Sequence, residues 1–252
     1  MSDGEGEGAS RDVTIDPREV EFYTRLADTW WDRDGPFWPL HKLNELRTQY
    51  IKDKLCRHFA RSSTVERPLE GLQVVDVGCG GGILSEAMAK LGASVTGIDV
   101  VDKNIQIASL HAAQQGIDVD YRVATAAEVA ASGTVFDIVL NMEVVEHVAD
   151  VGLFMRDCTR LTADGGVMFV ATINRTPLAW LFAIVGAEYV LRWLPRGTHR
   201  WSMFRKPEDI AAHLQDGGLV VRDIVGVAVN PFARSLHITA STAVNYMMFC
   251  TA

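Results

Sequence analysis

The apolar positions of the chain fall into short continuous runs that alternate with stretches of helical periodicity. The runs lie at residues 73–77, 94–98, 119–123, 136–140 and 167–171, and helical stretches follow the first two at 83–91 and 103–115. Strands that are apolar throughout are usually buried on both faces, and helices between them imply parallel crossovers. The pattern predicts an α/β fold with a doubly wound, mostly parallel sheet and a ligand at the carboxyl ends of its strands.

Further segments surround this core pattern. Residues 1–15, which begin with a run of glycine and acid, are expected to be a disordered tail. Residues 16–60 are expected to form a helical and aromatic N-terminal cap, which Pro36 and Pro39 break near its middle. The α/β domain covers residues 61–252. Its last predicted elements are a helix and two closing strands, at 207–217, 220–225 and 245–249.

The composition narrows the classes of function. Of the 252 residues, 48% are hydrophobic and 22% charged, as in an ordinary globular protein with a substantial core. The formal net charge of -8 argues against nucleic acid as a partner, because phosphate contacts need clustered cations. The four cysteines include no C-x-x-C pair, and the chain start resembles neither a signal nor a transit peptide. These features favour free thiols and a protein that works inside the cell.

A glycine-rich loop follows the first predicted strand. Glycines there let the backbone approach a ligand closely, and the next helix offers unpaired N–H groups. The dinucleotide pattern G-x-G-x-x-G would need a glycine at Ile83, and Asp76 stands where dinucleotide folds keep an apolar residue. With Gly78, Gly80 and Gly82, the loop has the methyltransferase form D-x-G-x-G-x-G. The motif predicts binding of S-adenosylmethionine, with Asp76 meeting its ammonium group directly or through water.

Two further residues follow strands at the same edge of the sheet. Asp99 ends the second strand, where an acid typically accepts hydrogen bonds from both ribose hydroxyls of a bound cofactor. The alternative is that Asp99 caps the next helix. Met142 lies just past the fourth strand, where either a cofactor contact or plain core packing is expected.

An acid and histidine cluster follows the fourth strand. Glu143, Glu146 and His147 are spaced i, i+3 and i+4, so on a helix their side chains would share one face. Such a group can hold a divalent cation that polarises a phenolic oxygen. In a metal-free version, His147 is the general base. A third interpretation is that the acids only complement the dipole of a helix.

The insertion at residues 174–201 holds the most apolar stretch of the chain, at 177–191. This stretch is shorter than the roughly 20 residues that a spanning helix needs, and Glu188 interrupts it. Its composition fits either a lid or interfacial helix over the active site or a buried core helix. Cations and indoles of the kind found at lipid headgroups follow it: Arg192, Trp193, Arg196, Arg200 and Trp201.

With these residues in hand, the sequence resembles the ubiquinone biosynthesis O-methyltransferase family. The resemblance extends from about residue 21 to residue 249, nearly the whole chain. The glycine loop belongs to the whole methyltransferase superfamily, whereas the N-terminal block and the block at 185–199 are narrow to this family. The matching blocks are 30–32, 39–44, 46–47, 76–84, 142–148, 172–176, 184–189, 195–199 and 244–247.

The resemblance implies methyl transfer from S-adenosylmethionine to two ring hydroxyls, on a 2-polyprenyl-6-hydroxyphenol and later on a demethylubiquinol. It implies that the insertion at about 174–197 contacts anionic membrane lipid, because a polyprenylated substrate lives in the bilayer. The expected location is peripheral on the bacterial inner membrane, or the matrix side of the mitochondrial inner membrane in a eukaryote. Other enzymes of ubiquinone biosynthesis are expected as further partners.

The resemblance also assigns residues. It makes Arg47, Gly78, Asp99 and Met142 the cofactor contacts, and it places a magnesium-type ion on Glu143, Glu146 and His147. Three other functions stay open at this point. They are methylation of another small lipophilic phenol, a cofactor-binding scaffold in a membrane-bound biosynthetic complex, and, least favoured by Ile83 and Asp76, a nicotinamide oxidoreductase.

Overall fold

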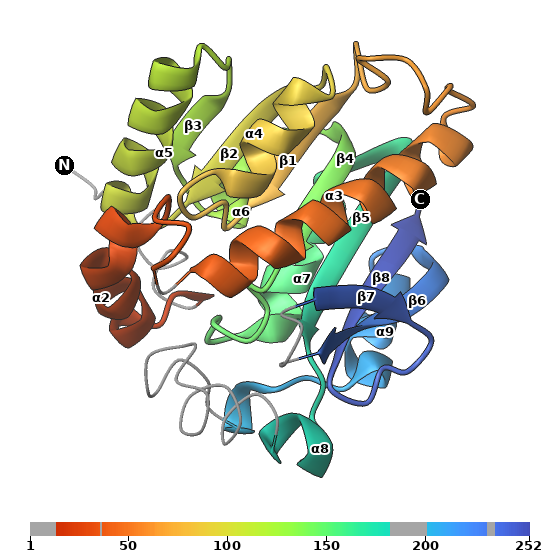
Figure 1. Cartoon of the computed structure of the whole chain (residues 1–252). Coiled ribbons are helices and arrows are strands. Elements are labelled where there is room, and N and C mark those ends of the chain that lie inside the picture. The colour runs from red at the N-terminus through yellow and green to blue at the C-terminus, as the bar shows by residue number, and fades with distance from the viewer. Residues whose placement is uncertain (1–13, 36, 182–200, 231–234) are drawn as a thin grey trace, which may run out of the picture.

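The computed structural model of the chain describes residues 14–35, 37–181, 201–230 and 235–252 (Figure 1). Within them, one mixed sheet has the strand order β3-β2-β1-β4-β5-β8-β6-β7. The first five strands in this order pair in parallel. After them, β8 pairs antiparallel with β5, β6 with β8, and β7 with β6. The strands are β1 (Gln73–Val77), β2 (Ser94–Asp99), β3 (Asp120–Val123), β4 (Phe136–Met142), β5 (Thr162–Ile173), β6 (Val220–Asn230), β7 (Ser235–Thr239) and β8 (Asn245–Thr251).

Helices cover both faces of this sheet, as the apolar runs predict. Val74 packs in one core cluster with α3 (Trp38–His58) and α4 (Ile83–Lys90). Its neighbour Val75 points to the opposite face and a second cluster, because successive side chains of a strand alternate. The helices of that second cluster are α6 (Ala126–Ala131), α7 (Val151–Arg160) and α9 (Pro207–Asp216), while α5 (Asp102–Gln115) packs against β2 and β3. The predicted doubly wound α/β fold is confirmed.

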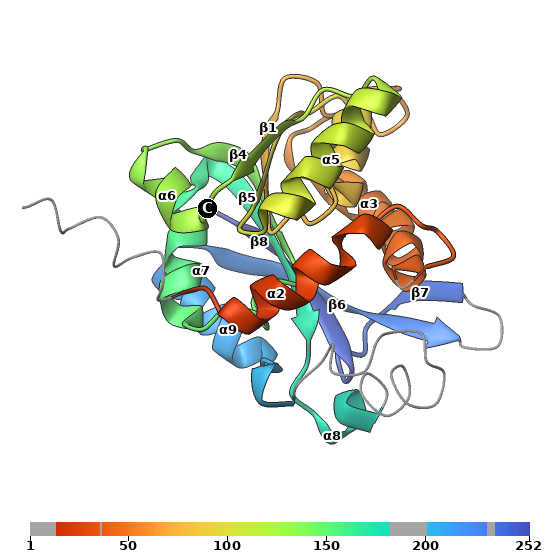
Figure 2. The ribbon, with the colours of Figure 1, turned by 90° about the vertical axis from the view of Figure 1, so that its left-hand side faces the viewer.

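The N-terminal cap consists of α2 (Pro17–Leu26), the short 3-10 helix η1 (Ala27–Thr29) and α3. Figure 2 shows α2 lying across the end of the sheet that carries the carboxyl ends of the parallel strands. Pro39 lies in the first turn of α3, where a missing N–H is tolerated, so it opens this helix instead of breaking one. Pro36 lies outside the described residues.

Residues 14 and 15, which were expected to belong to the disordered tail, are held by backbone contacts. Ile15 forms an isolated antiparallel bridge with Val148, and the amide of Ala149 donates to the Thr14 carbonyl at 3.0 Å. Backbone pairing of this kind fixes the start of α2 beside the segment that follows β4. Residues 1–13 lie outside the described part of the chain.

The sequence pattern did not predict three of the observed elements, and most of the predicted insertion lies outside the described residues. The helices α6 and α7 and the strand β7 lie in regions to which the pattern assigned no element. Of the insertion, the structure describes α8 (Pro177–Ala179) and the residues around it, whereas residues 182–200 lie outside the described part. No helix in the described segments is long and apolar enough to cross a membrane.

Candidate active site

A cavity of about 720 Å³ opens at the carboxyl edge of the sheet, and all the site residues expected from the sequence line it. This volume is in the range typical of small-molecule sites. The cap contributes one wall and the sheet edge the opposite one. Apolar side chains of the antiparallel strands and their surroundings line the remaining part: Ile173, Leu181, Val227, Val229, Leu236 and Val244.

The glycine loop is packed tightly against its neighbours. Gly78 and Gly80 have φ angles of 70° and 55°, a region that disfavours any residue with a Cβ. A Cβ on Gly80 would lie 2.6 Å from the Trp30 ring, and one on Gly78 would lie 2.5 Å from a Val144 methyl carbon. Trp30 in turn stacks on Phe37 with a centroid separation of 3.9 Å. The aromatic cap therefore rests directly on the loop.

Asp99 lies beside this loop, at the end of β2. Its carboxylate accepts hydrogen bonds from the amides of Gly80 at 2.9 Å and Val101 at 2.8 Å. The helix-capping alternative is wrong, because α5 begins after Val101 and has no side-chain cap. Burial raises the pKa of Asp99, and its carboxyl borders the cavity where a ribose contact is expected.

Asp76 is a buried carboxyl near the end of β1, and it lines the same cavity. Its Oδ2 accepts a hydrogen bond from the Ser85 hydroxyl at 2.6 Å. Burial raises the pKa of Asp76 to about 7, and the nearby Asp99 charge adds to the effect. A cationic group bound here would hold Asp76 in its charged form, which is the role that the sequence motif predicts.

Arg47 lies on the cavity side of α3 and is buried. Its guanidinium forms an ion pair with the carboxylate of Glu143. Met142, at the end of β4, lines the cavity and also packs against the core cluster under α3 and α4. Arg47, Gly78, Asp99 and Met142 are thus brought together around one cavity, and their individual cofactor contacts stay predictions.

The acid and histidine cluster does not lie on a helix, so the shared helical face considered from the sequence does not form. Glu143 has a φ of 61°, so the chain turns sharply where β4 ends. The amide of Glu143 still bonds to the Ala171 carbonyl at 2.8 Å, and the His147 amide closes a turn onto the Val144 carbonyl at 2.8 Å. In this turn, the side chains of the cluster reach three different elements instead of sharing one helical face.

Glu146 points toward β5. It is 2% exposed, and the Thr172 hydroxyl donates to its Oε2 at 2.6 Å. Burial raises the pKa of Glu146 well above its usual range, and the charge of Glu143, which also hydrogen-bonds to Glu146, raises it further. Glu146 is therefore a buried carboxyl that links Thr172 to the Arg47–Glu143 pair.

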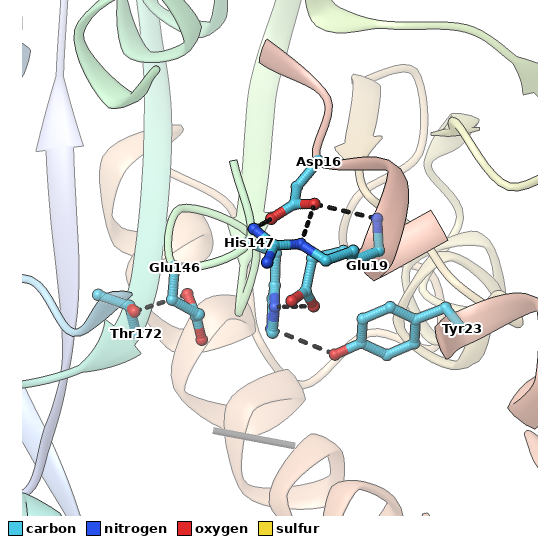
Figure 3. Close-up of polar contacts among 7 residues, drawn as sticks. Asp16, Glu19, Tyr23, Glu146, His147 and Thr172 are labelled. Carbon is cyan, nitrogen blue, oxygen red and sulfur yellow. Dashed lines mark hydrogen bonds and ion pairs between the residues drawn. The ribbon is translucent and has the colours of Figure 1, made fainter. Parts of the chain in front are cut away.

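His147 points toward α2, as Figure 3 shows. Its Nδ1 lies 2.9 Å from Oε2 of Glu19, and its Nε2 lies 3.2 Å from the Tyr23 hydroxyl. Sequence reasoning missed both partners from α2. Their i, i+4 spacing after the helix-capping Asp16 was the available signal that one helical face carries a carboxylate and a phenol.

These arrangements do not fit the predicted magnesium ion as they stand. Glu143 is paired with Arg47, Glu146 is buried and hydrogen-bonded to Thr172, and both ring nitrogens of His147 have partners. Within the described residues, no three His, Cys, Asp or Glu side chains are grouped to hold a metal. A magnesium site on Glu143, Glu146 and His147 stays a prediction that requires these contacts to change.

The donor set does fit S-adenosylmethionine. A buried guanidinium suits its carboxylate, a buried carboxyl at the end of β2 suits its ribose, and Asp76 suits its ammonium group. A doubly wound sheet with this loop and edge defines a class I S-adenosylmethionine-dependent methyltransferase. In agreement, a family model described as a methyltransferase domain matches residues 75–170.

Known relatives narrow the class further. A ubiquinone biosynthesis O-methyltransferase of Brucella anthropi is 53% identical over 236 residues, which are 94% of this chain and 95% of the relative. One from Rhizobium etli is 52% identical over 235 residues, or 93% and 95% of the two chains. The chain belongs to the ubiquinone biosynthesis O-methyltransferase family. It is an S-adenosylmethionine-dependent O-methyltransferase, and the oxidoreductase and scaffold alternatives are set aside.

Solved structures support the same fold. Magnesium protoporphyrin IX methyltransferase of Synechocystis, with bound S-adenosylhomocysteine, superposes with a TM-score of 0.63 at 18% identity. The superposition covers 94% of this chain and 99% of that one. A methyltransferase of Thermotoga maritima gives the same TM-score at 14% identity, covering 92% and 98% of the two chains. At these identities the likeness shows the shared fold alone.

The raised pKa of Asp76 predicts how stability depends on pH. In the unfolded chain the carboxyl ionises near pH 4, but in the folded protein burial moves its pKa to about 7. Between these values the unfolded state loses its proton first, so stability falls as pH rises. Asp76→Asn should therefore stabilise the cofactor-free protein by roughly 2–4 kcal/mol at pH 8 and much less near pH 4.5.

Thermal unfolding of the cofactor-free protein at both pH values checks this prediction. Asp118→Asn, at an exposed position, is the matched control and should change stability little. The Asp76 variant should also bind S-adenosylmethionine more weakly, because the partner of the ammonium group is lost. If Asp76→Asn were less stable than the wild type at pH 8, burial of the charged Asp76 carboxylate would not be destabilising, and the prediction would be contradicted.

Proposed function

We propose that this enzyme methylates ring hydroxyls of polyprenyl-hydroxyphenol and demethylubiquinol intermediates, with His147 as the proton acceptor. One observation carries the proposal: the phenolic hydroxyl of Tyr23 lies 3.2 Å from Nε2 of His147 inside the cavity. The site thus already holds a phenol against an imidazole. A substrate hydroxyl in the same place would be within reach of a general base.

The residues of the chain divide the remaining work. When bound, S-adenosylmethionine supplies a methyl group on a positively charged sulfur. Arg47 takes its carboxylate, Asp76 its ammonium group and Asp99 its ribose, while Gly78 and Met142 contact it at the loop and at the end of β4. His147 accepts the phenolic proton as the oxygen attacks in line. Holding both reactants in one dry cavity contributes through orientation.

The apolar end of the cavity supports a lipid-like substrate. Leu178, Trp180 and Leu181 are 43%, 45% and 48% exposed, and Leu181 also lines the cavity. Exposed apolar side chains that lead into a cavity suit contact with a membrane surface and entry of a polyprenyl tail. The proposed location is peripheral on the inner membrane, with anionic lipid and other enzymes of the pathway as partners.

Methyl transfer from labelled S-adenosylmethionine to a short-chain demethylubiquinol tests this function. We expect transfer with the wild-type protein, a lower KM for prenylated than for unprenylated catechols, and a kcat reduced by about 10²–10⁴-fold in His147→Gln. His58→Gln, at an exposed position on α3, is the matched control. Tight cofactor binding without transfer to any quinol or polyprenyl catechol would contradict the proposed substrates.

A magnesium-type ion on Glu143, Glu146 and His147 is proposed as the alternative to a metal-free His147 that accepts the proton, and it has a separate test. The Arg47 guanidinium competes with any cation for Glu143, and the carboxylate of S-adenosylhomocysteine should draw Arg47 away. In calorimetric titrations we expect magnesium to bind when S-adenosylhomocysteine is present and not when it is absent. Glu143→Ala should abolish this binding. Equal binding with and without S-adenosylhomocysteine, or none in either case, would contradict the proposal.

A further inference from the structure

We propose that Glu19 on α2 is a positioning residue that orients the His147 imidazole for the reaction. This inference rests on the proposed function, in which His147 meets the reacting hydroxyl. Glu19 Oε2 lies 2.9 Å from Nδ1 of His147, and the two side chains are only 17% and 16% exposed. A charge-assisted hydrogen bond in such a shielded place is strong and directional.

The backbone holds Glu19 and His147 in register from both sides. Ile15, one residue before the helix cap, bridges to Val148, one residue after the imidazole. Asp16 then caps α2 by accepting from the Arg18 amide at 3.0 Å. Glu19 follows one turn later, so a short rigid path joins it to the His147 backbone. The contact between them is a consequence of how α2 is anchored.

The hydrogen bond to Glu19 fixes the form of the imidazole. A carboxylate accepts only, so Nδ1 carries the proton and Nε2 keeps a lone pair. The Tyr23 hydroxyl, 3.2 Å from Nε2, is the donor to that lone pair, because a ring nitrogen without a proton can only accept. Nε2 therefore faces the cavity in the state that accepts a proton. Carboxylate, imidazole and hydroxyl stand in the order used by hydrolytic triads.

The reaction balances with these groups alone. The phenolic oxygen of the substrate forms a bond to the methyl carbon as the carbon–sulfur bond breaks, and the bonding electrons return to sulfur. Nε2 accepts the phenolic proton. The resulting imidazolium is stabilised by the Glu19 carboxylate. Tyr23 marks the place of the substrate hydroxyl, and the two hydroxyls compete for Nε2.

Steady-state kinetics of Glu19→Gln test the inference, with Glu21→Gln as the matched control. Glu21 lies on the same helix, is 72% exposed and forms an ion pair with Arg25 on the helix surface. We expect Glu19→Gln to lower kcat by about 10–100-fold, the scale seen when residues that orient a functional imidazole are changed. The KM values for cofactor and quinol should stay within about twofold, because a positioning residue acts on the chemical step.

The outcomes separate this inference from the proposed function. Wild-type protein that methylates no quinol would refute the function itself. Active wild-type protein with equal kcat in Glu19→Gln and Glu21→Gln would overturn the positioning role. A rise in both KM values with an unchanged kcat would also overturn it, since that is the signature of a helix that has merely lost its docking.

Tyr23→Phe is a second, independent measurement, because it removes the competing hydroxyl and keeps the ring. We expect the KM for the quinol to fall by about 2–10-fold, the range of one ordinary hydrogen bond. A higher KM for the quinol would show that Tyr23 helps to bind the substrate and would overturn its role as a placeholder.

Discussion

Burial of carboxyl groups at the carboxyl edge of the sheet is the constraint on which the site depends. Asp76, Asp99 and Glu146 are 3%, 8% and 2% exposed, and burial raises the pKa of each. Among the described residues, Arg47 is the one buried lysine or arginine near them. Charged carboxylates in such a place are costly unless a partner cation arrives. A sulfonium cofactor with an ammonium group would bring positive charge to these carboxyl groups.

The aromatic cap makes this constraint effective. Trp30 rests on the glycine loop, and its indole N–H donates to the Asn104 side chain at 2.8 Å. Because the cap closes over the glycine loop and these buried carboxyl groups, electrostatic attraction there is stronger than at a surface. The same closure raises the cost of every unpaired carboxylate. Cofactor affinity and the cost of burying these carboxylates thus have one physical origin.

The sequence predicted those parts of the protein that depend on local pattern. Apolar runs identified the central strands because burial on both faces leaves no polar position. The glycine loop and Asp99 followed because a strand end and the next helix fix them locally. The spacing of i, i+3 and i+4 from Glu143 to His147 is compatible with a helix but does not define one, and no helix forms there. A residue with positive φ at the end of β4 directs the side chains elsewhere.

Contacts between distant segments could not be derived in this way. Glu19 and His147 are 128 positions apart, and Arg47 and Glu143 are 96 apart. Both pairs join the cap to the turn after β4. The role of each residue can be inferred only once its partner is known. One pair neutralises a carboxylate and the other orients an imidazole, so docking of the cap completes charge balance and catalytic geometry together. The chemistry at this sheet edge therefore depends on residues of the docked cap. This explains why a glycine loop alone identifies the cofactor but not the reaction.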